Sequence, residues 1–160
     1  MTEERFIHYM KTEQESLRRF LLGLCQGNAD MADDIAQEAL VRAYVASGSF
    51  KGLSSFRTWL FRIAYNCYID NLRTKNKATI STISNEALSI PGTYDADESF
   101  RYQQLYFALD KLSEKEKACV VLHYFEDRSL KEISSILQIP LGTVKYNLSM
   151  GRQHLKQLLQ

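Results

Sequence analysis

The chain has 160 residues, of which 45% are hydrophobic, 7 are Gly and 2 are Pro, and its formal net charge is +1. This length allows one domain or two small ones, and the low Gly and Pro content predicts an all-helical protein. The amino-terminal residues MTEERF do not resemble a signal peptide, and the longest apolar run, Phe20–Cys25, is too short to span a bilayer. We therefore expect a soluble, intracellular protein.

The charge is distributed unevenly. Residues 1–77 hold 11 Lys and Arg against 9 Asp and Glu, and residues 99–160 hold 9 against 6. Residues 78–98, between them, hold no Lys or Arg and 4 Asp and Glu. Two mildly basic blocks separated by an acidic spacer favour a nucleic-acid-binding protein.

Amphipathic helices are predicted over residues 5–26 and 29–46. On the second, Asp34, Gln37 and Glu38 are three and four residues apart, so they project from one face. The cluster is either a solvated acidic face near a helix amino terminus, which the helix dipole favours, or a docking surface for a basic protein partner. Because the following segment is strongly basic, we favour the docking surface.

A loop rich in Ser and Gly is predicted over residues 47–58. It contains Phe50, Leu53 and Phe56. Aromatic residues in such a loop either stack on an unpaired base or seal the end of a helical core. Both interpretations remain open from the sequence alone.

A basic and aromatic helix is predicted over residues 55–75. Residues 51–77 carry six Lys or Arg, one acid and five aromatic residues. This composition is expected of a helix that contacts phosphates while bases stack on its rings. We assign Trp59 and Ile63 to the core, whereas Tyr65 either packs or contacts DNA.

Helical periodicity is absent from Ala78 to about Asp97, where polar residues, Pro and Gly predict a flexible linker. A helix is then predicted over residues 98–111. Ser113 and Glu116 form a capping box that opens the next helix. Tyr124, near the end of that helix, is expected to pack beneath the elements that follow.

The stretch Ser129–Leu159 predicts two helices joined by a turn at Gln138-Ile139-Pro140, because proline disfavours helical geometry in the residue before it. This pattern is a helix-turn-helix, whose second helix lies in the DNA major groove. An ordinary amphipathic hairpin is the alternative, but no acid follows Glu132, which favours DNA. The outward face of the second helix is expected to show Lys145, Tyr146, Ser149 and Arg152, with Asn147 at its edge.

No catalytic constellation is recognisable in the sequence, whether a nucleophile with its base, a Gly-rich phosphate loop or a metal-ligand spacing. Cys25, Cys67 and Cys119 are far apart and in apolar surroundings, so we expect buried, reduced thiols. We therefore expect a non-catalytic protein without a metal, a cofactor or a small-molecule substrate.

Three segments, in this order, resemble the extracytoplasmic-function (group IV) sigma factors, promoter-specificity subunits of RNA polymerase in the sigma-70 family. DDIAQEALVRAY (33–44) resembles the core-binding helix, FRTWLFRIAYNCYIDNLR (56–73) the promoter-melting and minus-ten segment, and residues 112–145 the domain that reads the minus-thirty-five element. The resemblance implies an all-α protein of two small helical domains, the second a four-helix helix-turn-helix domain. The implied units are residues 1–77, a flexible acidic linker over 78–98, and residues 99–160.

The resemblance also implies residue roles. Asp34, Gln37 and Glu38 would dock on the clamp helices of the polymerase beta-prime subunit, and the second domain would pack on the beta flap. The residues implied at minus-ten DNA are Phe50, Lys51, Leu53, Arg62, Tyr65, Asn66, Asp70 and Arg73. The residues implied at minus-thirty-five DNA are Thr143, Lys145, Tyr146, Asn147, Ser149 and Arg152.

The further partners that the resemblance implies are promoter DNA and an anti-sigma factor. The implied location is the cytoplasm, at the nucleoid or held at the inner membrane by that factor. The sequence departs from the family where Tyr146-Asn147 stands in place of a small residue and an arginine. Fewer cations predict weaker DNA affinity and a smaller salt dependence, and an amide at Asn147 is able to read adenine. We therefore expect an unusual minus-thirty-five preference, which an Asn147→Arg exchange should alter.

Two other classes of protein share part of this pattern. A free-standing transcription regulator would use the same helix-turn-helix, with an amino-terminal half that senses a ligand or dimerises. It leaves the basic-aromatic segment Phe56–Lys77 and the acidic face unexplained. A helical scaffold with incidental basic helices explains still less.

Overall fold

The computed structural model describes residues 1–78 and 96–159, with side chains over residues 1–74 and 101–159. Every regular element in these ranges is helical, which confirms the predicted all-α class. Most of the predicted linker lies outside the described residues, and the helix that follows begins at Ala96, two residues earlier than expected. The elements are α1 (Glu3–Leu24), α2 (Ala29–Ala46), the 3₁₀ turn η1 (Ser47–Ser49), α3 (Phe56–Ala78), α4 (Ala96–Asp110), α5 (Glu114–Val120), the π-helical turn η2 (Val121–Phe125), α6 (Leu130–Leu137) and α7 (Leu141–Leu158).

Local side-chain bonds explain where several helices begin. Asn28 caps α2 by accepting a hydrogen bond from the Met31 amide. Ser113 and Ser129 each form a complete capping box, with Glu116 and Glu132 respectively. The capping box predicted at Ser113 is therefore confirmed, and the same Ser-x-x-Glu spacing sets the start of the helix-turn-helix.

The amino-terminal half is a bundle of α1, α2 and α3. Its core includes Leu17, Leu21 and Ile35, and the rings of Phe20 and Phe61 stack with centroids 5.2 Å apart. The predicted core positions Trp59 and Ile63 are only half-buried. The described residues of α3 that are at most 1% exposed are Leu60, Phe61, Ala64, Cys67 and Tyr68.

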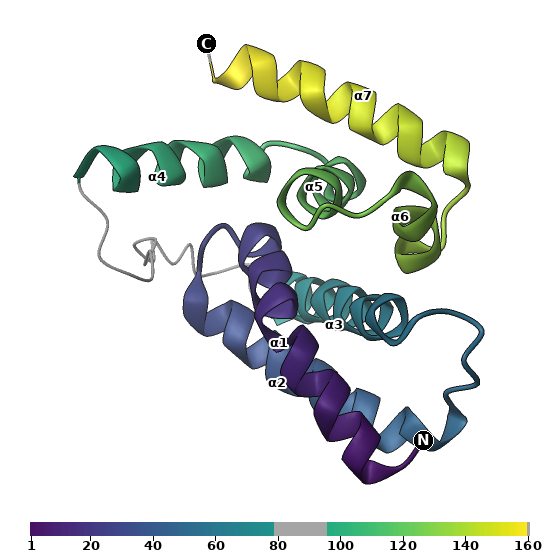
Figure 1. The fold of residues 1–160 in the computed structure, drawn as a ribbon. Helices are drawn as coiled ribbons and strands as arrows, with labels where there is room; N and C mark the ends of the chain where they lie inside the picture. The colour runs from purple at the N-terminus through teal and green to yellow at the C-terminus, as the bar shows by residue number, and fades with distance from the viewer. Residues whose placement is uncertain (79–95, 160) are drawn as a thin grey trace.

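The carboxy-terminal half consists of α4 to α7, with α7 packed across α5 and α6 (Figure 1). Gly151 permits the close approach of α7, since a Cβ there would lie 2.8 Å from Val120 Cγ2. Tyr124 is half-exposed rather than packed beneath α6 and α7. The π-helical turn explains this error, because its wider spacing rotates the following side chains relative to an α-helix.

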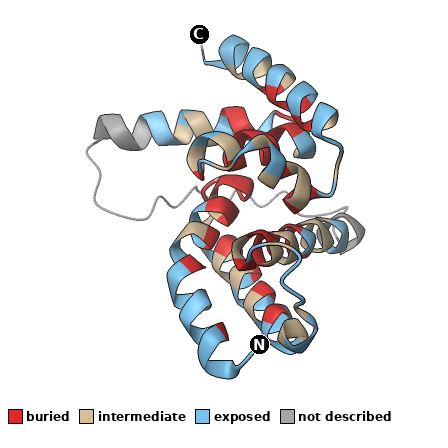
Figure 2. Cartoon of the chain, turned by 45° about the vertical axis from the view of Figure 1, so that its right-hand side comes forward, coloured by how far each residue is buried: buried red, intermediate tan, exposed pale blue. Residues whose placement is uncertain are grey.

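The two halves share one continuous buried cluster (Figure 2). Its contacts join α3 to α6 and α1 to η2. At the second contact, a Cβ on Gly23 of α1 would lie 2.9 Å from Val121 Cγ1. One face of α3 is consequently covered by the carboxy-terminal half, a feature that the sequence did not predict.

Candidate functional site

The acidic face on α2 is exposed as predicted: Asp34, Gln37 and Glu38 all lie at the surface. Arg42 adjoins it and pairs with Glu38 at 2.6 Å and with Asp70 of α3 at 3.1 Å. Because these side chains are roughly half-exposed, water screens both pairs and they contribute little to stability. They do orient Glu38 and Asp70 relative to each other.

Two exposed valines extend the acidic face. Val41 and Val45 are 62% and 79% exposed, and they follow Asp34 and Glu38 at helical spacing on α2. Large exposed apolar side chains beside charged ones are common where another protein binds. The sequence interpretation missed them, although their i+3 and i+7 spacing from Glu38 was visible.

The predicted DNA-contacting residues in the loop after α2 differ in their exposure. Phe50 is partly buried, with its ring centroid 5.0 Å from that of Trp59 and 6.1 Å from that of Phe56. In this structure it helps seal the end of the core, one of the two interpretations left open. Leu53 is 92% exposed and Lys51 is exposed, so these two side chains are available to a ligand.

The predicted minus-ten residues of α3 lie on two different faces. Asn66 and Arg73 are exposed and Asp70 is half-exposed, so these three form one accessible edge. Arg62 and Tyr65 lie on another face, which α5 and α6 cover. The structure therefore does not gather the whole predicted set at one open surface.

Arg62 contacts the helix-turn-helix. Its guanidinium donates to the Ser135 carbonyl oxygen from Nε at 3.1 Å and from Nη2 at 2.9 Å, and Nη2 donates to Ser135 Oγ at 3.0 Å. Ser135 is in the last turn of α6, where carbonyl groups lack intrahelical partners. Arg62 thus caps the first helix of the helix-turn-helix.

Tyr65 is buried under α5, with Lys115 Nζ 5.4 Å from its ring centroid. Burial, reinforced by the negative charge of Glu114, raises the pKa of Tyr65 to about 12. The Tyr65 hydroxyl has no hydrogen-bond partner among the described residues. A buried polar group in this state carries a desolvation cost that no contact offsets.

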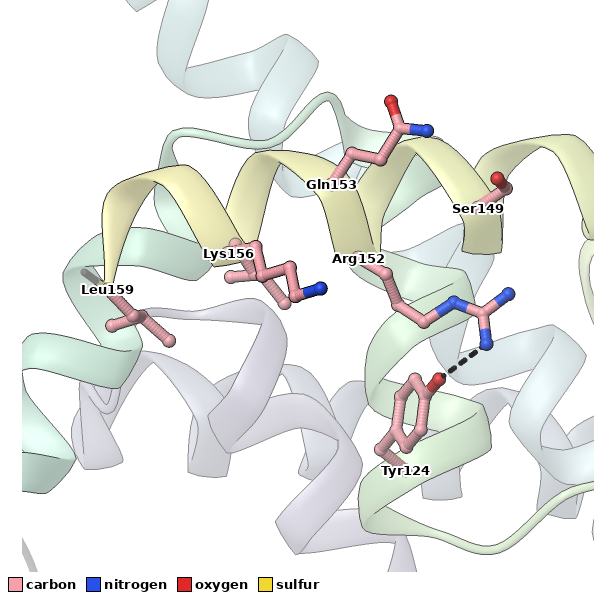
Figure 3. A pocket seen from close by; sticks show the side chains of 7 residues that line it. Tyr124, Ser149, Arg152, Gln153, Lys156 and Leu159 are labelled. Atoms are coloured by element: carbon pink, nitrogen blue, oxygen red, sulfur yellow. Dashed lines mark hydrogen bonds between the residues drawn. The ribbon is translucent and has the colours of Figure 1, made fainter.

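The helix-turn-helix presents most of its predicted residues. Lys145, Tyr146, Ser149 and Arg152 are exposed on α7, and Thr143 is half-exposed. Arg152 donates from Nη1 to the Tyr124 hydroxyl at 3.1 Å, and both residues line a hollow of about 690 Å³ together with Lys156 and Leu159 (Figure 3).

Asn147 is the exception on α7. It is 8% exposed, and its Nδ2 donates to the Thr143 carbonyl oxygen at 2.9 Å. It shares the buried side of α7 with Val144, Leu148 and Gly151. The expectation that Asn147 lies at the exposed edge of α7 is therefore corrected, because in this structure its side chain lies on the buried side and donates to its own helix.

Among residues 1–74 and 101–159, no group of three His, Cys, Asp or Glu is placed to hold a metal ion. In the same part of the chain, no helix combines the length and the apolar character needed to cross a membrane. Cys67 and Cys119 are buried thiols. Burial raises the pKa of each of these thiols to about 11.

Comparison with known proteins gives the class of the chain. The family model for Sigma-70 region 2 matches residues 10–78, and the model for Sigma-70 region 4 matches residues 102–155. The ECF RNA polymerase sigma factor SigW of Bacillus subtilis is 38% identical over 149 residues, covering 84% of this chain and 78% of SigW. EcfG of Rhodopseudomonas palustris is 29% identical over 144 residues, covering 90% of this chain and 79% of EcfG. The chain belongs to the extracytoplasmic-function (ECF) RNA polymerase sigma factors.

Solved structures show the same fold. The sigma factor RpoE of Bartonella quintana, crystallised with the anti-sigma factor NepR, superposes with a TM-score of 0.78 at 24% identity. The match covers 98% of this chain and 97% of RpoE. CnrH, in complex with the cytosolic domain of CnrY, superposes with a TM-score of 0.76 at 20% identity, covering 99% of this chain and 89% of CnrH.

Proposed function

We propose that this protein directs core RNA polymerase to specific promoters and nucleates the melting of promoter DNA, as a non-catalytic subunit. The observation that carries the proposal is the order of three surfaces along one chain that belongs to this family. An acidic docking face on α2 is followed by the basic, aromatic helix α3 and then by the helix-turn-helix of α6 and α7. A free-standing transcription regulator would need only the helix-turn-helix.

Core polymerase docks on α2 through Asp34, Gln37 and Glu38, with the beta-prime clamp helices as the partner. Basic clamp side chains would complement the two carboxylates. Val41 and Val45 supply apolar area on the same stripe, and burial of apolar area is the main favourable term in most protein association. The beta flap contacts the carboxy-terminal half.

The minus-ten element is read by α3 and by the loop before it. Asn66, Asp70 and Arg73 form the accessible edge, and the exposed Lys51 and Leu53 lie in the loop that receives a flipped base. Extruding a base costs a few kcal/mol of unstacking, which pocket and stacking contacts offset. Phe50 forms the inner wall of that pocket from its position against Trp59.

The minus-thirty-five element is read in the major groove by α7. Lys145 and Arg152 contribute cations, while Tyr146, Ser149 and Thr143 offer further polar groups. The functional units are residues 1–77 and 99–160, joined by the acidic linker over 78–98. An anti-sigma factor is a further partner, in keeping with the complexes of RpoE with NepR and of CnrH with CnrY. The protein works in the cytoplasm, at the nucleoid or held at the inner membrane by that factor.

Run-off transcription tests the proposal. Core polymerase is supplied with genomic fragments and with the native chain or the Asp34→Ala/Gln37→Ala/Glu38→Ala variant. A matched control, Glu3→Ala/Glu4→Ala/Gln157→Ala, removes two exposed carboxylates and one exposed amide elsewhere. New start sites are expected with the native chain and the control and not with the docking variant. No new start sites, together with tight specific duplex binding by the chain alone, would instead support a free-standing regulator.

A further inference from the structure

Three residues of α3 at intervals of three, Arg62, Tyr65 and Tyr68, face the carboxy-terminal half. Arg62 bonds Ser135 of α6, the Tyr65 ring lies under Lys115 of α5, and Tyr68 bonds Lys117 of α5. Arg62 and Tyr65 are also predicted minus-ten contacts. One edge of the DNA-reading helix is therefore occupied by the half of the molecule that carries the helix-turn-helix.

The contact at Tyr68 is fully buried. Tyr68 and Lys117 are 1% and 2% exposed, and Lys117 Nζ donates to the Tyr68 hydroxyl at 2.9 Å. That hydroxyl also lies 2.8 Å from Glu114 Oε2 and 3.1 Å from the Leu24 carbonyl oxygen. A lysine buried to this degree requires partners, and here α1, α3 and α5 all contribute to the polar cluster around it.

A second buried charge lies at the contact between α1 and the end of η2. Glu126 is 4% exposed, and the guanidinium of Arg19, 107 residues away in the chain, donates to both of its oxygens at 3.2 Å. Removing Arg19 while the halves stay packed would leave a buried carboxylate without its cation, which is strongly unfavourable. The close approach at Gly23 lies on the same helix.

We propose that the free chain is held closed by these contacts and that the minus-ten strand competes with α5 and α6 for the Arg62–Tyr65 edge of α3. This inference rests on the proposed function. The Arg62 guanidinium has one set of donors, which bind either the Ser135 carbonyl oxygen or a phosphate. The Tyr65 ring is likewise either covered by α5 or open to a base, and opening hydrates its unsatisfied hydroxyl.

Closure has a quantitative consequence for DNA binding. When only a fraction of a protein is in the binding-competent form, its apparent affinity falls by that fraction. If about a tenth of the chain is open, opening it fully tightens DNA binding about tenfold. A partner that binds the separated halves would produce the same gain, so docking on polymerase and exposure of the Arg62–Tyr65 edge are coupled.

Two substitutions on α1 open the chain without changing a proposed DNA or polymerase contact. Gly23→Leu places a side chain where even a Cβ would lie 2.9 Å from Val121 Cγ1, and leucine is a better helix former than glycine. Arg19→Ala removes the cation from Glu126 and keeps α1 intact, which provides a second test if Gly23→Leu fails to fold. Glu15→Ala, at an exposed position of α1, is the matched control.

The full-length variants are compared by small-angle X-ray scattering and by binding to a short random-sequence single-stranded DNA. The native chain and Glu15→Ala should scatter as the compact structure, whereas Gly23→Leu or Arg19→Ala should expand and bind DNA about tenfold more tightly. Adding Arg62→Ala to either opening variant should abolish the gain. The claim that the free chain is closed would be wrong if the native chain had the dimensions of an expanded molecule, or if the opening variants folded but stayed compact.

If the opening variants expand but do not bind DNA more tightly, the proposed competition between the minus-ten strand and the helices α5 and α6 is wrong. The scattering measurement does not depend on polymerase or on transcription. A failure of the closed state is therefore distinguishable from a failure of the proposed function, which run-off transcription tests separately.

Discussion

The guanidinium of Arg62 lies 2.9 Å from the carbonyl oxygen of Ser135, so a residue of α3, the helix proposed to read the minus-ten element, caps the first helix of the helix-turn-helix. The same guanidinium would otherwise be free to bind a promoter phosphate. This contact connects the packing of the two halves with access to DNA.

The capping box of α6 should stabilise the helix-turn-helix. In Ser129→Ala the Glu132 amide loses the hydroxyl that it bonds at 3.1 Å, and we expect a loss of about 1 kcal/mol in the free energy of unfolding. Urea denaturation followed by circular dichroism measures this change. Ser149→Ala, at an exposed position of α7, should alter stability by less than about 0.5 kcal/mol. Equal effects of the two substitutions would contradict the assigned role of Ser129.

The approach of α7 to α5 should depend on Gly151. Gly151→Ala gains helix propensity, but its Cβ meets Val120 Cγ2 at 2.8 Å, so overpacking should outweigh the gain and lower stability by about 1 kcal/mol. Gly142→Ala, in open space on the same helix, should be neutral or stabilising. Combining Gly151→Ala with Val120→Ala should cost less than the sum of the two single changes, as measured by thermal unfolding. Strict additivity would show that the two residues do not clash.

Recognition of the minus-thirty-five element should be insensitive to the Asn147 amide. Since that amide bonds the Thr143 carbonyl oxygen, Asn147→Ala should leave the sequence preference unchanged. Lys145→Ala, which removes an exposed cation, should weaken binding to all sequences and reduce the salt slope by about one unit. Promoter libraries transcribed by the holoenzyme at several salt concentrations measure both effects. A changed base preference in Asn147→Ala would restore the sequence-based expectation.

The two most deeply buried thiols should make stability depend on alkaline pH. Burial raises the pKa of Cys67 and Cys119 to about 11, above the value of a cysteine in an unfolded chain. The native state then holds more protons than the unfolded state between about pH 9 and 11, so stability falls as pH rises through this window. Replacing both residues with Ala should flatten this part of the profile in urea titrations at stepped pH.

The same burial should protect these thiols from alkylation. At pH 8 a thiol with a pKa of about 11 is ionised roughly a hundredfold less than an ordinary cysteine, and iodoacetamide reacts with the thiolate. Peptide mass spectrometry should therefore find Cys67 and Cys119 labelled only after unfolding. Rapid labelling of either residue in the native protein would contradict the burial described for it.

Much of the fold was predictable because its determinants are local. The capping box at Ser113 and the break at Pro140 each depend on a few adjacent residues, and both are present in the structure. The exposed face of α2 likewise follows from helical spacing. The π-helical turn was missed because α-helical periodicity places Tyr124 inward, whereas the wider turn leaves it half-exposed.

Residue spacing could not predict that the predicted minus-ten residues of α3 lie on two different faces, one of them covered by the carboxy-terminal half. Arg62 and Ser135 are 73 residues apart in the chain, and Arg19 and Glu126 are 107 apart, so no local pattern reports that they meet. Asn147 was placed wrongly for a different reason. A polar side chain is acceptable on the buried side of α7 when its own helix supplies a hydrogen-bond acceptor, and polarity alone does not reveal that bond.

The most direct test of the central claim is permanganate footprinting of thymines across the minus-ten region of a promoter identified by run-off transcription. With core polymerase and the native chain, thymines there should become reactive as the duplex opens. The Asp34→Ala/Gln37→Ala/Glu38→Ala variant should leave them protected. Equal reactivity with both proteins, or protection with both while the start site is still used, would contradict a sigma factor that docks through α2 and nucleates melting through α3.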